Sequence, residues 1–155
     1  MDDQKFLPEA ISLAAENARK GGGPFGALIV KNGKVVGKGI NRVLDTGDPT
    51  AHAEVVAIRD ACKNIGDFRL DGCVIYTSCE PCPMCLGAIY WAHLDRIVFA
   101  ATKDDASRCG FDDSFIYKEM ALPFDQRSIP VKRVEVKNAL EPFEQWTRLD
   151  NKTQY

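Results

Sequence analysis

The apolar residues of this chain fall into segments of helical and of strand-like spacing. A first helix is predicted by four residues that recur at helical intervals: Leu7, Ile11, Ala14 and Ala18. The glycine run 21–23 is expected to end this helix, because glycine is a poor helix former. Residues 27–31 and 35–39 then flank Asn32-Gly33, whose tolerance of positive φ favours a two-residue turn. The pattern therefore predicts a helix followed by a β-hairpin.

Further elements are expected downstream. They are a helix over 51–63 with Thr50 as its N-cap, strands over 74–76, 97–99 and 131–136, a helix over 82–92, and a terminal helix carrying Leu140, Phe143, Trp146 and Leu149. Helices that alternate with strands usually cover both faces of one sheet. We therefore expect an α/β fold of three layers, in which helices flank a central mixed β-sheet.

Length and charge fit one globular domain that covers residues 1–155. With 20 Lys and Arg against 22 Asp and Glu, the net charge is −2, which is not the basic footprint of a nucleic-acid-binding protein. The acidic start of the chain lacks a signal-peptide pattern, and no apolar segment is long enough to span a bilayer. We expect a cytoplasmic protein without a membrane or nucleic-acid partner, in which Cys62, Cys73 and Cys109 are reduced packing residues.

Two short motifs carry the chemistry of the chain. His52-Ala53-Glu54 is followed by Pro81-Cys82-Pro83-Met84-Cys85, so one imidazole and two thiolates are available as zinc ligands. Three protein ligands leave the fourth tetrahedral position to a water molecule, and zinc lowers the pKa of that water. Glu54, two residues from the ligand His52, can then carry the released proton to a substrate. The motifs predict a catalytic zinc site at the first turns of two helices.

Other metal sites fit part of the same pattern. Cys79, Cys82 and Cys85 form a C-x-x-C-x-x-C run, which can hold an iron–sulfur cluster or supply Cys79 as a fourth ligand to a structural zinc site. Such a closed site would indicate a noncatalytic interaction module rather than an enzyme. It would require neither Glu54 nor the flanking Pro81, and the sequence therefore favours catalysis.

The H-x-E and P-C-x-x-C pairing is the signature of zinc deaminases, and the chain resembles the cytidine and nucleobase deaminase superfamily. Segments 48–54 and 80–89 resemble the branch that contains guanine, cytosine and tRNA adenosine deaminases. Residues 110–119 and 151–155 are similar to bacterial guanine deaminases. The resemblance implies a cytidine-deaminase-like fold, one zinc ion per subunit, and hydrolytic deamination of free guanine to xanthine and ammonia. Cytosine deaminase and tRNA adenosine deaminase remain the alternatives.

The resemblance also implies roles for individual residues. His52, Cys82 and Cys85 match the zinc ligands, and Glu54 matches the acid/base. Asp113 matches a second carboxylate, which contacts the purine and helps to protonate the departing amine. Positions of the substrate pocket are matched by Phe25, Asn41, Ala53, Trp91 and Tyr155. From local sequence alone, these residues could also have purely structural roles. Asp113 could be a loop charge or a helix cap, Asn41 a turn residue, and Phe25 and Trp91 core residues.

The C-terminal segment, about 137–155, matches a part of bacterial guanine deaminases that crosses to the partner subunit and covers its active site. The resemblance thus implies a swapped homodimer in which Tyr155 belongs to a lid that excludes water. A terminal residue is usually frayed unless its segment is docked, so Tyr155 is expected to matter only if the segment docks in this way.

Overall fold

The hairpin predicted around Asn32-Gly33 is present in the computed structural model, which describes residues 3–155. β1 (Gly26–Lys31) and β2 (Lys34–Ile40) pair antiparallel through this turn. Asn32 and Gly33 have φ values of 50° and 74°, the left-handed conformation that a tight hairpin turn requires. The prediction of this hairpin is confirmed.

Two further strands extend the hairpin into a mixed four-stranded sheet. β3 (Cys73–Cys79) pairs antiparallel with β1, and β4 (Arg96–Ala101) pairs parallel with β3, which gives the order β2-β1-β3-β4. Every residue of β3 is buried, as expected for a central strand that is covered on both faces. At the carboxyl ends of the parallel pair, Cys79 lies opposite Ala101.

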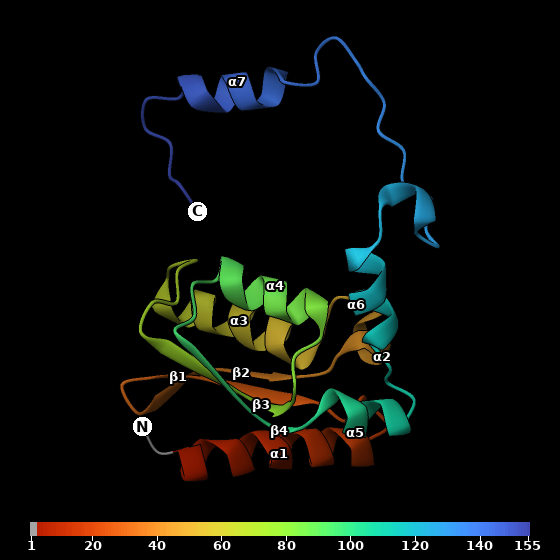
Figure 1. Ribbon diagram of the computed structural model, residues 1–155. Helices are drawn as coiled ribbons and strands as arrows, with labels where there is room; N and C mark the ends of the chain where they lie inside the picture. The colour runs from red at the N-terminus through yellow and green to blue at the C-terminus, as the bar shows by residue number, and fades with distance from the viewer. Residues whose placement is uncertain (1–2) are drawn as a thin grey trace. The chain divides into compact units, whose positions relative to one another are not determined.

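Helices cover both faces of this sheet (Figure 1). One face carries α1 (Asp3–Arg19), and the other carries α3 (Ala53–Ile65) and α4 (Pro83–Trp91). Successive residues of a strand point to opposite faces, so Leu28 of β1 packs in one core cluster with Phe6 of α1, whereas Ile29 packs in the other with Ala57 of α3. The three-layer α/β/α fold with a mixed sheet is confirmed.

Two glycines of β2 let α3 approach the sheet closely. A Cβ atom on Gly39 would lie 2.0 Å from the carbonyl oxygen of Ala53, and one on Gly37 would lie 2.5 Å from that of Ala57. Cβ atoms essentially never come this close to other heavy atoms, so glycine is needed where the backbones meet. The first turn of α3 therefore rests directly on the backbone of β2.

The chain divides into two compact units, the first ending at Phe115 and the second running from Ile116 to Tyr155. The first unit also holds the short helices α2 (Val43–Thr46) and α5 (Lys103–Arg108). After α6 (Ser114–Ala121), the second unit contains the 3₁₀ helix η1 (Phe124–Gln126) and α7 (Glu141–Arg148). The expectation of one domain with an exchangeable C-terminal segment stays a prediction.

None of the helices formed by residues 3–155 combines the length and apolar character needed to cross a membrane.

Two local predictions are wrong. Residues 131–136 form no strand, although apolar and polar residues alternate along them. They are exposed and pair with none of the four strands of the described chain, which all lie between residues 26 and 101. The N-cap of α3 is His52 and not Thr50. Thr50 instead donates its amide and its hydroxyl to Oδ1 of Asp48, at 2.8 and 2.7 Å. Asp48 thus holds Thr50 in a turn before the helix begins.

Candidate active site

His52 and Cys82 stand at the starts of two helices on the same face of the sheet. Each is an N-cap with extended backbone, at φ −66° and ψ 155° for His52 and φ −67° and ψ 168° for Cys82. Pro83 follows Cys82 in the first turn of α4, where its missing amide costs no helical hydrogen bond. Neither N-cap side chain makes a capping hydrogen bond. Both side chains are therefore available to a metal.

The three predicted ligands come together in space. His52 Nδ1 lies 3.5 Å from Cys82 Sγ and 3.4 Å from Cys85 Sγ, and the three ligand atoms all lie within 4.8 Å of one another. Zinc bonds of about 2.1 Å to nitrogen and about 2.3 Å to sulfur hold tetrahedral N and S ligands roughly 3.6 Å apart. One imidazole and two thiols at this spacing therefore fit zinc, and they form the metal-binding cluster of residues 3–155.

The ligand side chains control one another's protonation. Hydrogen bonding with Cys85 first and with His52 second lowers the pKa of Cys82 to about 4. Bonding to Cys82 in turn raises the pKa of Cys85 well above its usual range, and it also raises the pKa of His52. Zinc binds thiolates and neutral imidazole, so zinc uptake by this cluster releases protons.

Glu54 is a buried carboxyl beside the ligands. It lies in the first turn of α3 with 7% of its surface exposed, and its Oε2 accepts a hydrogen bond from the Cys85 thiol at 3.4 Å. Burial, more than any neighbouring charge, raises the pKa of this carboxyl. A carboxyl that can hold and release a proton next to a metal site is the group that acid/base catalysis requires.

Cys79 does not join the ligand cluster. Its Sγ donates to the carbonyl oxygen of Thr102 at 3.6 Å, and burial raises the pKa of its thiol to about 11. Thiolate is the ligand form of cysteine, and this thiol keeps its proton at neutral pH. The cluster of the described residues contains only Cys82 and Cys85 as sulfur ligands, which removes the support for a closed site or an iron–sulfur cluster.

Asn41 and Phe25 lie beside each other where the hairpin begins and ends. The Asn41 amide donates to the Phe25 carbonyl oxygen at 3.1 Å, and Asn41 Oδ1 accepts from the Val43 amide at 3.2 Å. Asn17 of α1 holds this region, since its Nδ2 donates to the carbonyl oxygens of Gly23 at 2.8 Å and Asn41 at 2.9 Å. Asn17 therefore positions a predicted pocket residue.

Sequence reasoning missed Asn17, although one signal was present. Ala10, Ala14 and Asn17 are spaced as one helical face, and all three are buried in α1. A polar amide on an apolar helix face requires hydrogen-bond partners, and here they are backbone carbonyl groups of the flanking loops.

Asp113 lies half-buried within electrostatic range of the ligands. Burial raises the pKa of its carboxyl most, and the charge on Cys82 raises it further. Phe111, two residues earlier, packs edge-on against Phe25, with ring centroids 5.0 Å apart and an interplanar angle of 90°. Residues 111–113 therefore connect the Phe25 side of the site with the ligand side.

The other predicted pocket residues are more dispersed. The Ala53 side chain is buried in the core, so a contact with substrate there would come from its backbone. Trp91 is exposed at the end of α4. Tyr155 belongs to the second unit and packs edge-on against Trp146, with ring centroids 6.4 Å apart. The substrate contacts of these residues stay predictions.

Comparison with known proteins places these features in context. Residues 1–101 match the cytidine and deoxycytidylate deaminase zinc-binding region. The sequence is 53% identical to a guanine deaminase of Bacillus subtilis over 156 positions, which cover 100% of both chains. An X-ray structure of guanine deaminase from Bacillus subtilis matches with a TM-score of 0.97 at 52% identity, over 100% of this chain and 99% of that one. A tRNA-specific adenosine deaminase of Aquifex aeolicus is 40% identical over 65% of this chain and 67% of its own length.

Proposed function

The chain belongs to the zinc-dependent cytidine and deoxycytidylate deaminase family, and we propose that it hydrolyses guanine to xanthine and ammonia. The observation that carries the proposal is the similarity to a bacterial guanine deaminase, which extends over the entire chain and so includes Asp113 and the C-terminal segment. tRNA-specific adenosine deaminases are less similar: one is 40% identical over 65% of the chain, and another is 32% identical over 88% of it. A net charge of −2 also gives the protein no overall attraction to RNA.

His52, Cys82 and Cys85 would hold the metal. When bound there, zinc lowers the pKa of a water molecule and supplies a hydroxide nucleophile at neutral pH. The ligands sit at the N-termini of α3 and α4, whose helix dipoles favour negatively charged thiolates. The two helices thus provide electrostatic support for the ligand forms that zinc requires.

Glu54 moves the protons of the reaction. Hydrolysis forms a bond from a water oxygen to C2 of guanine and breaks the bond from C2 to the exocyclic amine. Glu54 takes a proton from the attacking water and delivers it to a ring nitrogen of the purine. Its burial supports this role, because a carboxyl with a raised pKa exchanges protons more readily near neutral pH.

Asp113 acts on the amino side of the substrate. We propose that its carboxylate accepts a hydrogen bond from guanine and then helps to protonate the amine, which leaves as ammonia. Asn41 hydrogen-bonds the base, while Phe25 and Trp91 contribute apolar contacts to the planar ring. The support for this arrangement is the shared location of Asn41, Phe25 and residues 111–113 described above.

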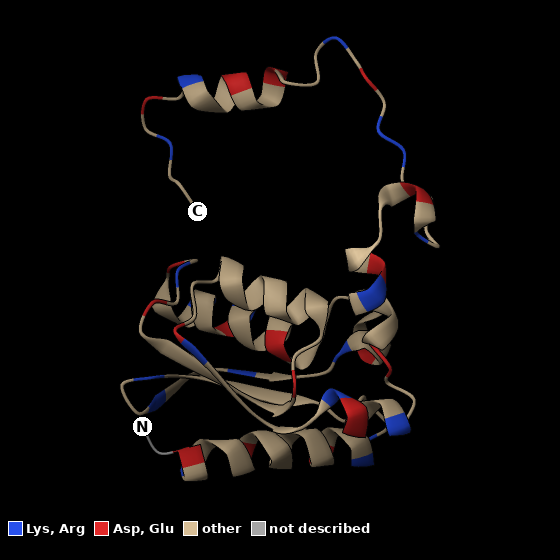
Figure 2. Cartoon of the chain, viewed as in Figure 1, with Lys and Arg blue, Asp and Glu red and all other residues tan. Residues whose placement is uncertain are grey.

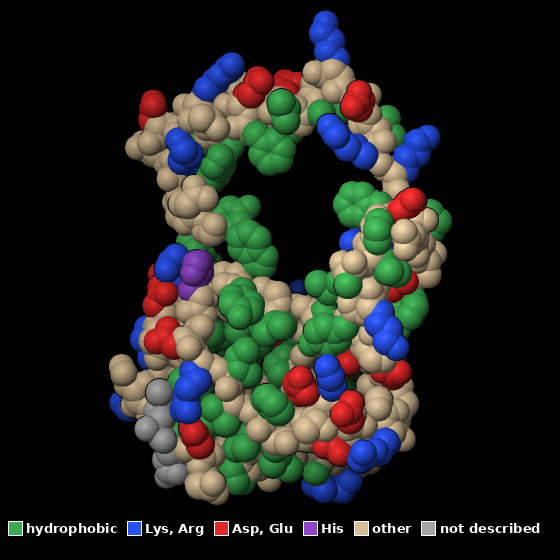
Figure 3. Space-filling view, in the orientation of Figure 1, with side chains coloured by type: hydrophobic (Ala, Val, Ile, Leu, Met, Phe, Trp, Pro, Cys, Tyr) green, Lys and Arg blue, Asp and Glu red, His purple; other side chains and the backbone are tan. Residues whose placement is uncertain are grey.

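The protein is further proposed to be a homodimer in which residues 137–155 of one chain, including Tyr155, cover the site of the other. α4 supports this proposal, because it carries no charged residue (Figure 2) and leaves Met84, Tyr90 and Trp91 exposed. Hydrophobic side chains gather on the same face of the first unit (Figure 3), and a surface of this kind is typical of an interface. Light scattering should give twice the chain mass of 17.2 kDa, and a monomer would contradict the proposal. A cytoplasmic location stays a prediction.

The function is tested by incubating zinc-loaded protein with free guanine and following xanthine formation by ultraviolet absorbance. Glu54→Gln should retain zinc but reduce kcat by at least about a hundredfold, since it removes the proton carrier. Folded, zinc-loaded protein that leaves guanine unchanged would contradict the substrate assignment. Cytosine and a tRNA anticodon stem-loop would then be assayed in the same way.

A further inference from the structure

Glu80 joins the loop that carries Cys82 to the segment that carries Asp113. The loop is short, since β3 ends at Cys79 and Cys82 already caps α4. The Glu80 amide donates to the carbonyl oxygen of Ala101 at 2.8 Å, and Glu80 Oε2 accepts from the Lys103 amide at 3.0 Å. One residue thus binds both the end of β4 and the first residue of α5.

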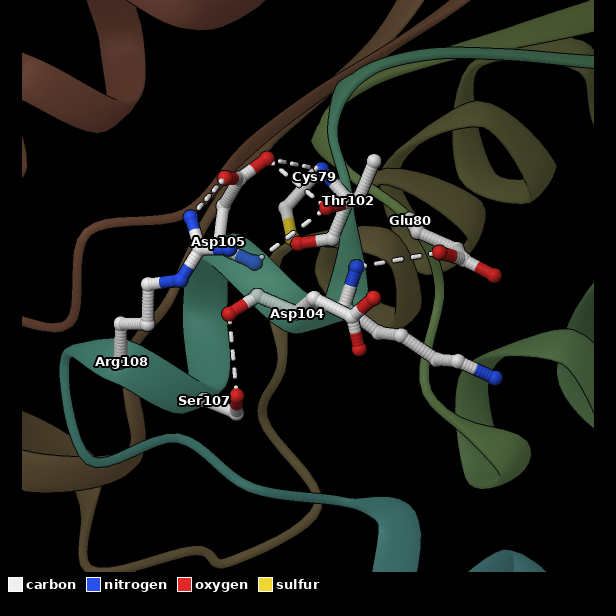
Figure 4. Close-up of polar contacts among 8 residues, drawn as sticks. Cys79, Glu80, Thr102, Asp104, Asp105, Ser107 and Arg108 are labelled. Carbon is white, nitrogen blue, oxygen red and sulfur yellow. Dashed lines mark hydrogen bonds and ion pairs between the residues drawn. The ribbon is translucent and has the colours of Figure 1, made fainter.

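Neighbouring residues make further polar contacts at the same junction (Figure 4). The Cys79 thiol donates to the Thr102 carbonyl oxygen at 3.6 Å, between the two groups that Glu80 binds. Thr102 also forms a capping box with Asp105, whose Oδ2 accepts from the Thr102 amide at 2.9 Å and from its hydroxyl at 2.8 Å. Backbone groups of three successive residues, 101–103, are therefore fixed by Cys79 and Glu80.

A short path leads from this junction to Asp113. α5 ends at Arg108, and the Phe111 amide folds back to the Ala106 carbonyl oxygen at 3.1 Å. The Phe111 ring is then held edge-on by Phe25. Asp113 lies in the loop just beyond this contact, so its location depends on where α5 begins and on where Phe111 packs.

Charges at the junction also reach Asp113. After burial and the charge on Cys82, the pKa of Asp113 responds to Lys103, which lowers it, and to Glu80, which raises it. The side-chain charges of Glu80 and Lys103 therefore both act on the Asp113 carboxyl. This agrees with the path traced along the backbone.

From this geometry we propose that Glu80 is a positioning residue, which acts on the reaction through Asp113 by fixing residues 102–113 against the Cys82 loop. The inference rests on the proposed role of Asp113 in the site. Catalytic groups must be held closely, because a displacement of about 1 Å can cost on the order of a hundredfold in rate. Asp113 lies directly before α6, and Glu80 fixes the segment that precedes Asp113 from the metal side.

Single substitutions test the contact. Glu80→Ala removes the acceptor and should lower kcat for guanine about tenfold, whereas Glu80→Gln keeps an acceptor oxygen and should stay within about threefold of the wild type. Asp95→Ala is the matched control, since Asp95 Oδ1 accepts from the Gly72 amide at 2.9 Å across a similar sequence separation. It should lower the melting temperature as Glu80→Ala does and leave kcat unchanged. Equal loss of kcat in Glu80→Gln and Glu80→Ala would overturn the proposal.

A double-mutant cycle identifies the residue through which Glu80 acts. In an Asp113→Ala background, measured by single turnover at high enzyme concentration, Glu80→Ala should change the rate by less than about twofold. A tenfold loss in both backgrounds, or loss of zinc from Glu80→Ala, would show that Glu80 acts elsewhere and would overturn the proposal. If Asp113→Ala alone keeps full kcat, the proposed role of Asp113 is wrong. If Asp113→Ala loses kcat and Glu80→Ala does not, only the positioning role is wrong.

Discussion

Gly39→Ala is the most direct test of how the sheet positions the site. The added Cβ would lie 2.0 Å from the carbonyl oxygen of Ala53 and 2.5 Å from the amide nitrogen of Ala57, both backbone atoms that cannot rotate away. The start of α3 must therefore move by roughly 1 Å, and overpacking of this kind costs about 3 kcal/mol. For a chain of this size that corresponds to a fall in melting temperature of roughly 10 °C.

The same substitution should weaken zinc binding, because His52 begins the helix that moves. A shift of the imidazole away from Cys82 and Cys85 is expected to reduce zinc affinity at least about tenfold. The measurements are thermal unfolding of zinc-free protein and competition for zinc with a chelator. Lys38→Ala is the control, since the neighbouring residue of β2 is exposed and loses only an ion pair with Glu9. Normal stability of Gly39→Ala, or lowered stability with unchanged zinc affinity, would refute the reasoning.

Three further outcomes are expected. Cys79→Ser should keep zinc at one ion per chain, because its thiol bonds Thr102 and not the metal; loss of zinc on dialysis would contradict this. Removal of residues 151–155 should lower turnover of guanine while zinc stays bound, and unchanged turnover would exclude the lid. Asp3→Asn should lower stability at pH 7, since hydrogen bonding from Arg96 first and Tyr76 second lowers the pKa of Asp3. That stabilisation is present above the unfolded pKa of about 3.9 and is lost as pH falls through the lower folded pKa. The urea unfolding curves of zinc-free wild type and variant should therefore converge once the pH lies below the folded pKa.

The sequence predicted best where neighbours along the chain decide the structure. The Asn32-Gly33 hairpin depends on local φ preferences, and the cluster of His52, Cys82 and Cys85 depends on ligand type and motif spacing. Both were confirmed. The prediction of Thr50 as the N-cap of α3 was wrong, because the Asp48 side chain hydrogen-bonds the Thr50 amide in a turn and the helix begins after His52.

The contacts that sequence reasoning missed join residues far apart in the chain. Asn17 bonds Asn41 across 24 positions, and Glu80 bonds Lys103 across 23. Residue type alone identifies neither contact, because amides and carboxylates are common on exposed surfaces. Only the position of Asn17 on the apolar face of α1 indicated that it needs a partner. The strand prediction for residues 131–136 was wrong for a related reason, since a strand forms only where its backbone can pair with a neighbouring strand.

The uncapped helix starts described at the active site have a consequence for folding. An N-cap side chain that bonds the first turn contributes about 1 kcal/mol to a helix, and His52 and Cys82 both forgo that bond. The first turns of α3 and α4 therefore lack this local contribution. Without zinc, the amides of residues 53–55 and 84–86 should exchange hydrogen faster than the rest of α3 and α4, and zinc should slow them. Zinc would in this sense supply the local stability that a capping side chain supplies at other helix starts.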